Sequence, residues 1–239
     1  MSVDALVLVH GGFHGAWCWD RLLPHLERPV LAVDLPGRGK HPAPMEQVTL
    51  EACVRSVVAD IEAAGFERVV LVGHSLGGAT VPLVAARIPD RIAHLVLLSC
   101  IVAPDGGAIV DGFPEETRAL MRQRMGESES AEAEMDEETH RELIGSEMSD
   151  EDLRWVLANV GPDSNHLFMD RASRAGLPGD LPRTYIRLRR DRAVPWELQD
   201  QMISLLPGLS TRVIDAGHNV MISQPRELAE VLEDIAAQA

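Results

Sequence analysis

The stretch that decides the fold runs from Val69 to Arg87 and reads VVLVGHSLGGATVPLVAAR. An apolar run leads into a patch with three glycines, and a second apolar run with helical character follows. Residues 73–77 match the spacing G-x-S-x-G between a strand and a helix. Glycine is needed in such a turn because a Cβ atom would collide with the neighbouring strand. The pattern predicts that Ser75 is a nucleophile held above the edge of a sheet.

Around this turn the chain alternates between short apolar runs and runs with helical periodicity. The predicted strands are Ala5–Val9, Pro29–Gly39, Arg68–Gly73, His94–Cys100, Thr184–Leu188 and Thr211–Asp215. The predicted helices are Ala16–Glu27, Leu50–Ile61, Leu76–Ile88, Val194–Leu206 and a final helix opened by Pro225. This alternation predicts an α/β fold with a mostly parallel sheet of about six strands and helices on both faces.

The alternation stops once, between Pro104 and Pro182, where the sequence is acidic and favours helices. We therefore predict a core domain of residues 1–103 and 183–239, interrupted by a helical cap of residues 104–182. Between Glu127 and Asp152 there are twelve acidic residues and one arginine, which accounts for most of the net charge of −15. Two interpretations stay open: a solvated helical face, or a negative rim that repels anionic substrates.

The composition limits the classes of function. A net charge of −15 argues against binding to nucleic acid or to anionic membrane surfaces. No apolar run approaches the roughly 20 residues of a membrane-spanning helix, and no basic region precedes the first apolar run, so we expect no signal peptide. The cysteines, Cys18, Cys53 and Cys100, are far apart and match no metal-binding spacing, which favours reduced core residues in a cytoplasmic protein. A homodimer is left open.

With its G-x-S-x-G turn and its alternating strands, the chain resembles the α/β-hydrolase family over nearly its whole length. The resemblance implies a nucleophile, an acid and a histidine in that order along the chain. His218 follows the last predicted strand and precedes the last helix, which makes it the expected base. Asp191 ends the preceding strand and is the expected acid, with Asp215 as the alternative. The nearby acids Asp163 and Asp170 are assigned to the cap.

Stabilisation of an oxyanion requires two backbone N–H groups close to the developing charge. The N–H of Leu76 follows the nucleophile and is the first candidate. The second donor is expected from the turn after the first strand, where Gly12 is the preferred candidate and Phe13 the next. We expect the side chain of His10 to hold this turn by hydrogen bonds.

The first turn identifies a branch of the family. The run HGGFHGAWCWDRLLPHLE, residues 10–27, resembles the first loop of plant methyl esterases, hydroxynitrile lyases and their bacterial relatives, which typically reads H-G-x-x-H-G-x-W-x-W. Lyase members resemble a version with Thr after the first His and Lys after the catalytic His. The residues at these positions here are Gly11 and Asn219, which favours ester hydrolysis.

These observations predict a serine hydrolase that cleaves a small to medium, mainly apolar carboxylic ester through an acyl-enzyme, without a metal or an organic cofactor. The alternatives are a lactonase, a hydroxynitrile-lyase-like C–C lyase, or a slow-turnover receptor that captures its ligand. The residues expected to line the substrate pocket are Phe13, His14, Trp17, Ile101, Trp155 and Phe168.

Overall fold

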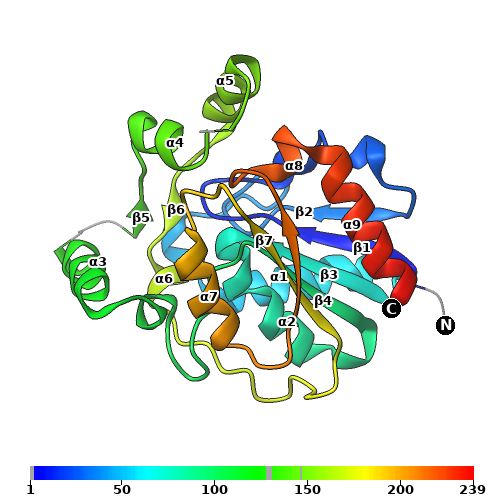
Figure 1. Cartoon of the computed structure of the whole chain (residues 1–239). Helices are drawn as coiled ribbons and strands as arrows, with labels where there is room; N and C mark the ends of the chain where they lie inside the picture. Colours follow the sequence, from blue (N-terminus) through cyan, green and yellow to red (C-terminus); the bar gives the residue numbers. More distant parts are fainter. Residues whose placement is uncertain (1–2, 128–130, 146) are drawn as a thin grey trace.

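In the computed structural model, which describes residues 3–127, 131–145 and 147–239, six parallel strands form one sheet in the order β2-β1-β3-β4-β7-β8 (Figure 1). The strands are β1 (Ala5–Val9), β2 (Val30–Val33), β3 (Val69–His74), β4 (Ile92–Leu98), β7 (Arg183–Leu188) and β8 (Ser210–Ile214). The central strands are buried on both faces, as parallel strands covered by helices are.

Helices cover the sheet on both faces, and successive side chains of a strand point to opposite faces. Leu6 and Leu8 pack into one core layer, whereas Val7 and Val9 pack into the other. The helices on the Val7 face are α1 (Leu50–Ala63), α2 (Val81–Arg87) and α7 (Trp196–Ser204). The opposite face carries α8 (Val220–Ser223) and α9 (Pro225–Gln238). The predicted α/β architecture is confirmed.

Two helix predictions are wrong in detail. Residues 16–27 form no α-helix but two short 3₁₀ turns, Ala16–Trp19 and Leu23–His25. Pro24 has no N–H to donate to a residue one turn earlier, so an α-helix cannot continue through it. The helix predicted from Leu76 begins later, because residues Ser75–Ala79 form a 3₁₀ turn before α2. The second strand, predicted within Pro29–Gly39 and ending in an Asp-Leu-Pro-Gly turn, runs from Val30 to Val33 and stops before that turn.

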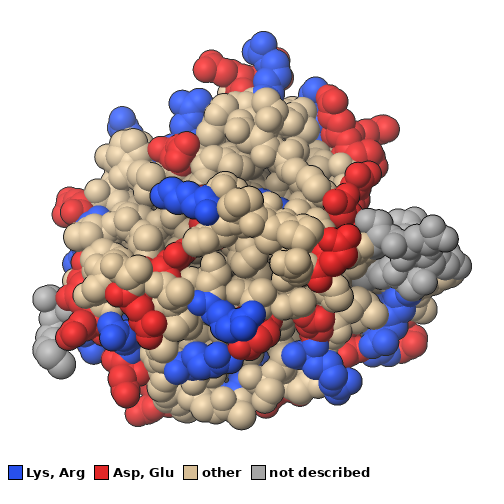
Figure 2. Space-filling view, turned by 180° about the vertical axis from the view of Figure 1, so that it is seen from behind, with Lys and Arg blue, Asp and Glu red and all other residues tan. Residues whose placement is uncertain are grey.

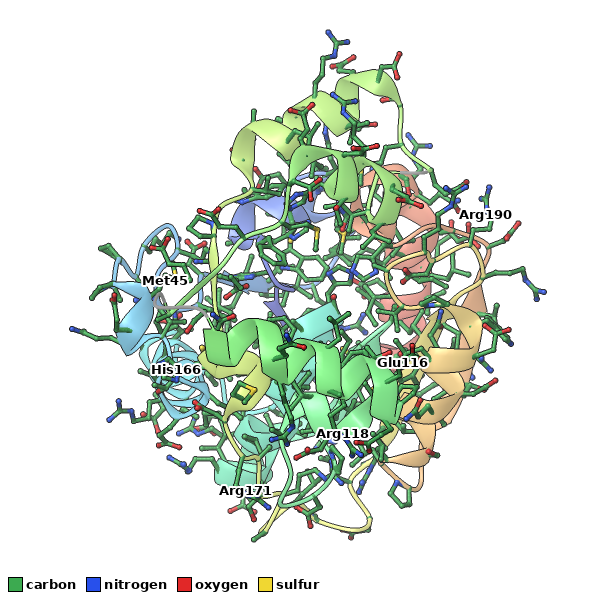
Figure 3. The ribbon with its side chains drawn as sticks, turned by 90° about the vertical axis from the view of Figure 1, so that its left-hand side faces the viewer. Met45, Glu116, Arg118, His166, Arg171 and Arg190 are labelled. Carbon is green, nitrogen blue, oxygen red and sulfur yellow. The ribbon has the colours of Figure 1, made fainter. Side chains whose placement is uncertain are left out.

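The inserted segment, residues 104–182, lies between β4 and β7 and projects to the left of the sheet in Figure 1. Its elements are α3 (Glu115–Glu127), β5 (Glu132–Ala133), α4 (Glu137–Leu143), α5 (Asp150–Asn159), β6 (Asp163–Ser164) and α6 (His166–Met169). It was expected to be a mostly helical cap without a strong strand signal, but β5 and β6 form a short antiparallel pair. Seen from that side, α3 crosses in front of the sheet, with α4 and α5 above it (Figure 3).

The acidic residues that cluster in the sequence also cluster on the surface (Figure 2). From behind, acidic side chains gather along the upper right edge, the side on which α4 lies, whereas basic and acidic groups alternate over the lower part (Figure 2). Cys18, Cys53 and Cys100 are free and buried. No helix within the described ranges is long and apolar enough to cross a membrane.

Candidate active site

Ser75 occupies the sharp turn between β3 and α2. Its φ is 51°, a left-handed conformation that non-glycine residues rarely adopt and that is typical of a strained functional turn. The glycines provide the space for this turn: a Cβ atom at Gly77 would lie 2.8 Å from the carbonyl oxygen of His10, and one at Gly11 would lie 2.7 Å from the Ser75 Cβ. The Ser75 side chain can therefore project over the strand ends.

Asp191 and His218 meet at the same edge of the sheet. Asp191 follows β7, His218 follows β8, and the His218 Nδ1 lies 2.7 Å from the Asp191 Oδ2. Because a carboxylate only accepts hydrogen bonds, Nδ1 carries the proton, and Nε2 of the neutral ring is left as an acceptor. Both side chains are almost completely buried, and His218 lines the same cavity as Ser75. The structure thus brings the three residues named from the sequence to one edge of the sheet.

A residue missed in the sequence holds the carboxylate of Asp191. Ser99 directly follows β4, is fully buried, and donates from Oγ to the Asp191 Oδ2 at 2.6 Å. The Val194 N–H donates to the other carboxylate oxygen at 2.8 Å. Since β4 and β7 are neighbours, the first residue after β4 lies beside the end of β7. Knowledge of the strand order, which no local pattern supplies, could have identified Ser99.

The alternative acid is placed elsewhere. The side chain of Asp215 is 67% exposed and pairs with the Arg190 guanidinium at 3.3 Å. Arg190, labelled in Figure 3, also pairs with Glu147 of the inserted segment at 2.6 Å. The arginine next to Asp191 in sequence therefore engages other acids, and the buried carboxylate of Asp191 is left to Ser99, Val194 and His218.

The two expected oxyanion donors lie on the cavity wall. Gly12 and Leu76 both line the cavity that contains Ser75. The Gly12 N–H has no hydrogen-bond acceptor in the part of the chain that the structure describes. Leu76 stands in the first turn of the 3₁₀ helix, where N–H groups lack intrahelical acceptors. The second choice from the sequence, Phe13, is wrong, because its N–H donates to the Asp163 Oδ2 at 2.8 Å and is not available.

Two further histidines, His10 and His74, hold the loops around Ser75 by hydrogen bonds. The His10 side chain donates from Nδ1 to the Gly11 carbonyl at 2.8 Å and accepts at Nε2 from the Leu35 N–H, which confirms its expected structural role. Burial lowers the pKa of His10 and holds the pKa of His74 well below its usual value. The His74 Nε2 donates to the backbone carbonyl of His218 at 3.0 Å and thus connects the serine turn to the histidine loop.

His14 is neutral and presents no free nitrogen to the cavity that it lines. Its Nδ1 donates to the Gly12 carbonyl at 2.7 Å, so Nε2 must accept, and the Asn219 side-chain amide lies 3.2 Å from it. Burial lowers the pKa of His14 to about 3. With both nitrogens occupied, the ring presents mainly its carbon atoms to the cavity.

Because burial keeps His14 neutral in the folded chain, we expect the free energy of unfolding to fall in mild acid. The unfolded chain protonates His14 near its ordinary pKa of about 6.5, whereas the folded chain does so only near 3. Between these values the unfolded state binds more protons, so the free energy of unfolding falls as the pH falls. From pH 7.5 to 5.5 we expect His14 to contribute about 1 kcal/mol of that fall.

Urea denaturation at the two pH values measures the effect. His14→Gln keeps a donor and an acceptor but does not titrate, so its stability should fall by about 1 kcal/mol less than that of the wild type. An equal fall in both proteins would contradict a neutral His14.

The cavity at Ser75 has a volume of about 140 Å³ and a mainly apolar lining. Four of the six residues expected to line it do so: Phe13, His14, Ile101 and Phe168. The lining residues that the sequence did not suggest are Met135, Leu143, Ile144, Ala193 and Val194. None of the described lining residues is an Asp, Glu, Lys or Arg.

Two expected lining residues, Trp17 and Trp155, are not among the described residues of the cavity wall. The Trp17 ring stacks on His14 with centroids 5.1 Å apart, and Trp155 packs edge-on against Trp17 at 5.1 Å. Of these three rings, His14 alone is among the described lining residues. The two tryptophans connect the inserted segment to the core instead.

Comparison with known proteins identifies the family. A profile of the alpha/beta hydrolase family matches residues 6–231. The chain is 31% identical to the probable esterase PIR7A of Oryza sativa subsp. indica, over 97% of this chain and 96% of the relative. It is 30% identical to methylesterase 10 of Arabidopsis thaliana, over 97% and 91%.

A solved structure shows the same fold. An extracellular alpha/beta-hydrolase from a Paenibacillus species superposes with a TM-score of 0.87 and 22% identity, over 96% of this chain and 98% of that one. No group of three or more potential metal-ligating side chains occurs among the residues described. Since the family profile spans both halves of the sheet and the Ser75 turn, the chain belongs to the alpha/beta hydrolase family and is a hydrolase related over almost its whole length to esterases.

Proposed function

We propose that this protein is a serine carboxylesterase in which Ser75 is the nucleophile, His218 the general base and Asp191 the residue that orients the base. The observation that carries the proposal is the buried Asp191–His218 hydrogen bond of 2.7 Å beside a cavity that both His218 and Ser75 line. A serine hydroxyl is a weak nucleophile at neutral pH and needs such a base, and the base needs an acceptor on its far nitrogen.

The proposed reaction has two halves. His218 Nε2 takes the proton of Ser75 as Oγ attacks the ester carbonyl, while Asp191 stabilises the resulting imidazolium without being protonated. The N–H groups of Gly12 and Leu76 stabilise the oxyanion. The tetrahedral intermediate collapses, the alcohol leaves with the proton from His218, and Ser75 carries the acyl group. A water molecule, deprotonated by His218, then releases the acid and restores the serine.

The shape of the cavity supports an apolar substrate of modest size. A volume of about 140 Å³ is close to the roughly 150 Å³ of a cavity that holds one benzene ring. A charged group would be desolvated there without a counter-ion, which is costly. The similarity to an esterase and a methylesterase supports ester cleavage. We propose uncharged esters in which the group that enters the cavity is no larger than about one ring.

We also propose that the inserted segment acts as a cap on this cavity. Met135, Leu143, Ile144 and Phe168 of the segment supply part of the apolar wall. Excluding water strengthens the electrostatic interactions at the reacting atoms. Glu137 and Glu138 in the first turn of α4 add negative charge to this segment, which disfavours anionic esters in addition to the lack of a Lys or Arg among the described lining residues.

A substrate panel tests the proposal. The p-nitrophenyl acetate, butyrate and laurate esters, a p-nitrophenyl hemisuccinate, a butyrolactone and mandelonitrile are offered to the purified protein. We expect the acetate and butyrate esters to be hydrolysed, with kcat/KM at least about tenfold lower for the hemisuccinate and the laurate. Preferred cleavage of the lactone or of mandelonitrile would contradict the esterase assignment. A long-lived adduct on Ser75 with almost no turnover would favour a ligand-binding receptor.

A further inference from the structure

Phe13, in the turn after β1, is held by the inserted segment through its backbone and its ring. Its φ is 63°, in the left-handed region that is costly for a bulky residue. The Phe13 N–H donates to the Asp163 Oδ2 at 2.8 Å, and the Phe13 carbonyl accepts from the Gly161 N–H at 3.0 Å. The Phe13 ring packs edge-on against His140 of α4, with centroids 5.5 Å apart. Both backbone polar groups of this strained residue are therefore bonded to the inserted segment.

The second oxygen of Asp163 completes the arrangement. The Asp163 Oδ1 accepts from the Ser164 N–H at 2.7 Å and lies 3.1 Å from the Arg38 Nη2. The Arg38 Nε donates to the His14 carbonyl at 2.9 Å. The side chain of Asp163 is 3% exposed and that of Arg38 is 10% exposed. The Asp163 carboxylate and the Arg38 guanidinium thus bind the Phe13 N–H and the His14 carbonyl in a nearly water-free setting, and this ion pair is called the bracket below.

This bracket determines where Gly12 lies. Gly12 precedes the strained residue, and a Cβ atom at Gly12 would lie 3.3 Å from the Asp163 Oδ2. A left-handed conformation is unfavourable for a non-glycine residue and persists only where its surroundings hold it. The Gly12–Phe13 peptide is held by two hydrogen bonds, from the Phe13 N–H to Asp163 and from the His14 Nδ1 to the Gly12 carbonyl at 2.7 Å, and without Asp163 only the second remains. The Gly12 N–H has no acceptor of its own among the described residues. Its direction therefore depends on the backbone on either side: on Phe13, and on the Gly11 carbonyl of the same peptide plane, which accepts from the His10 Nδ1 at 2.8 Å.

The charge of the bracket is also balanced. A lone carboxylate beside the Gly12 amide would oppose the developing negative charge on an oxyanion. Arg38, at 3.1 Å from Asp163, neutralises it. The pair can therefore orient the turn without an electrostatic penalty for the reaction.

We propose that Asp163, paired with Arg38, is a positioning residue: it fixes the conformation of Phe13 and thereby aims the Gly12 N–H at the oxyanion. The inference rests on the proposed esterase function. It makes the inserted segment part of the catalytic apparatus and not only a cover for the cavity, because the oxyanion donor is correctly oriented only while residues 161–163 are docked on the turn.

The test compares two carboxylates of the inserted segment that both accept a hydrogen bond from the backbone of the core. Asp170 accepts from the Leu50 N–H at 2.9 Å, at the start of α1 and not at the turn after β1. Asp163→Ala is expected to lower kcat by about 10²-fold, the effect of a misplaced oxyanion donor, with KM changed by less than about threefold. Asp170→Ala is expected to change kcat by less than about twofold, because it removes a tie between segment and core without touching the turn.

A transition-state analogue separates positioning from general loosening. A trifluoromethyl ketone forms an oxyanion on the nucleophile, whereas a neutral product alcohol does not. For Asp163→Ala the affinity for the ketone should fall in parallel with kcat/KM, while the affinity for the alcohol stays the same. If the alanine variant does not fold, Asp163→Asn keeps the volume but can serve only one of the Phe13 and Ser164 N–H groups. The kcat of Asp163→Asn should then fall by at least about tenfold.

Equal kcat values in the wild type and the Asp163 variants would overturn the inference, and so would equal losses in Asp163→Ala and Asp170→Ala. Equal weakening of ketone and alcohol binding would also overturn it, because that pattern marks a merely structural role. If the wild type hydrolyses no ester at all, the proposed function fails first and the inference fails with it. An active wild type with an equally active Asp163→Ala rejects the inference alone.

Discussion

Ser75→Ala is expected to lower kcat for p-nitrophenyl butyrate by about 10⁶-fold, to the level set by the oxyanion donors and by binding alone. The reason is chemical: alanine cannot form the acyl-enzyme, and water held near His218 is a poorer, unpositioned nucleophile. The fold should survive, since the replacement removes one oxygen atom from a partly exposed side chain. Thermal unfolding and ester hydrolysis of the same preparation check both statements.

A covalent probe provides the matched control for Ser75. A fluorophosphonate should add its mass once to the wild type and to Ser204→Ala, a variant of an exposed serine at the end of α7, but not to Ser75→Ala. Tryptic mass spectrometry should locate the adduct on the peptide that contains residue 75. Labelling of Ser75→Ala, or hydrolysis by that variant at a tenth of the wild-type rate or more, would show that another residue is the nucleophile.

Asp191→Asn is expected to lower kcat by about 10⁴-fold. The asparagine keeps the size of the side chain, but its NH₂ group cannot accept a hydrogen bond from the His218 Nδ1–H. The imidazole then favours the tautomer with the proton on Nε2, the nitrogen that must take the proton of Ser75. Steady-state hydrolysis across a range of pH measures the effect, because a wrong tautomer lowers the plateau of the profile at every pH.

Two further substitutions calibrate this result. Asp215→Asn changes an exposed carboxylate that pairs with Arg190, and its kcat should stay within about twofold of the wild type. Ser99→Ala removes one hydrogen bond to the buried carboxylate and should lower kcat by about tenfold, between the two aspartates. If Asp191→Asn is harmless and Asp215→Asn inactivates the protein, the proposed acid is wrong.

Most of the fold could be predicted from the sequence because it depends on short-range patterns. Apolar runs such as Ala5–Val9 are buried on both faces, and the helices α1 and α9 carry apolar residues at helical spacing. The failure at residues 16–27 has a local cause as well: the apolar spacing there is helical, but Pro24 prevents a continuous α-helix.

The site could be predicted only in part. Ser75, Asp191 and His218 each follow a strand, and parallel strands place their carboxyl ends at one edge, so the sequence was sufficient to choose them. The supporting contacts follow no such rule. Ser99 and Asp191 are 92 positions apart, and Phe13 and Asp163 are 150 positions apart. In the sequence, Asp163 is one of many acidic residues of the inserted segment, and no local pattern distinguishes it from the others.

The sequence alone therefore determined most of the core strands and helices along the chain and the tight serine turn, because these depend on neighbours within a few residues. Together with the order of nucleophile, acid and histidine that the family resemblance implies, it also gave the three residues proposed for the chemistry. Only the tertiary structure decided which side chains line the cavity and which hold the catalytic groups in place. Trp17 packs on His14 and Trp155 packs on Trp17, whereas Leu143 and Ile144 of the inserted segment lie on the wall. The physical reason is that the strand order and the docking of the inserted segment on the turn after β1 create these contacts, and no periodicity along the chain records where a long insertion will dock.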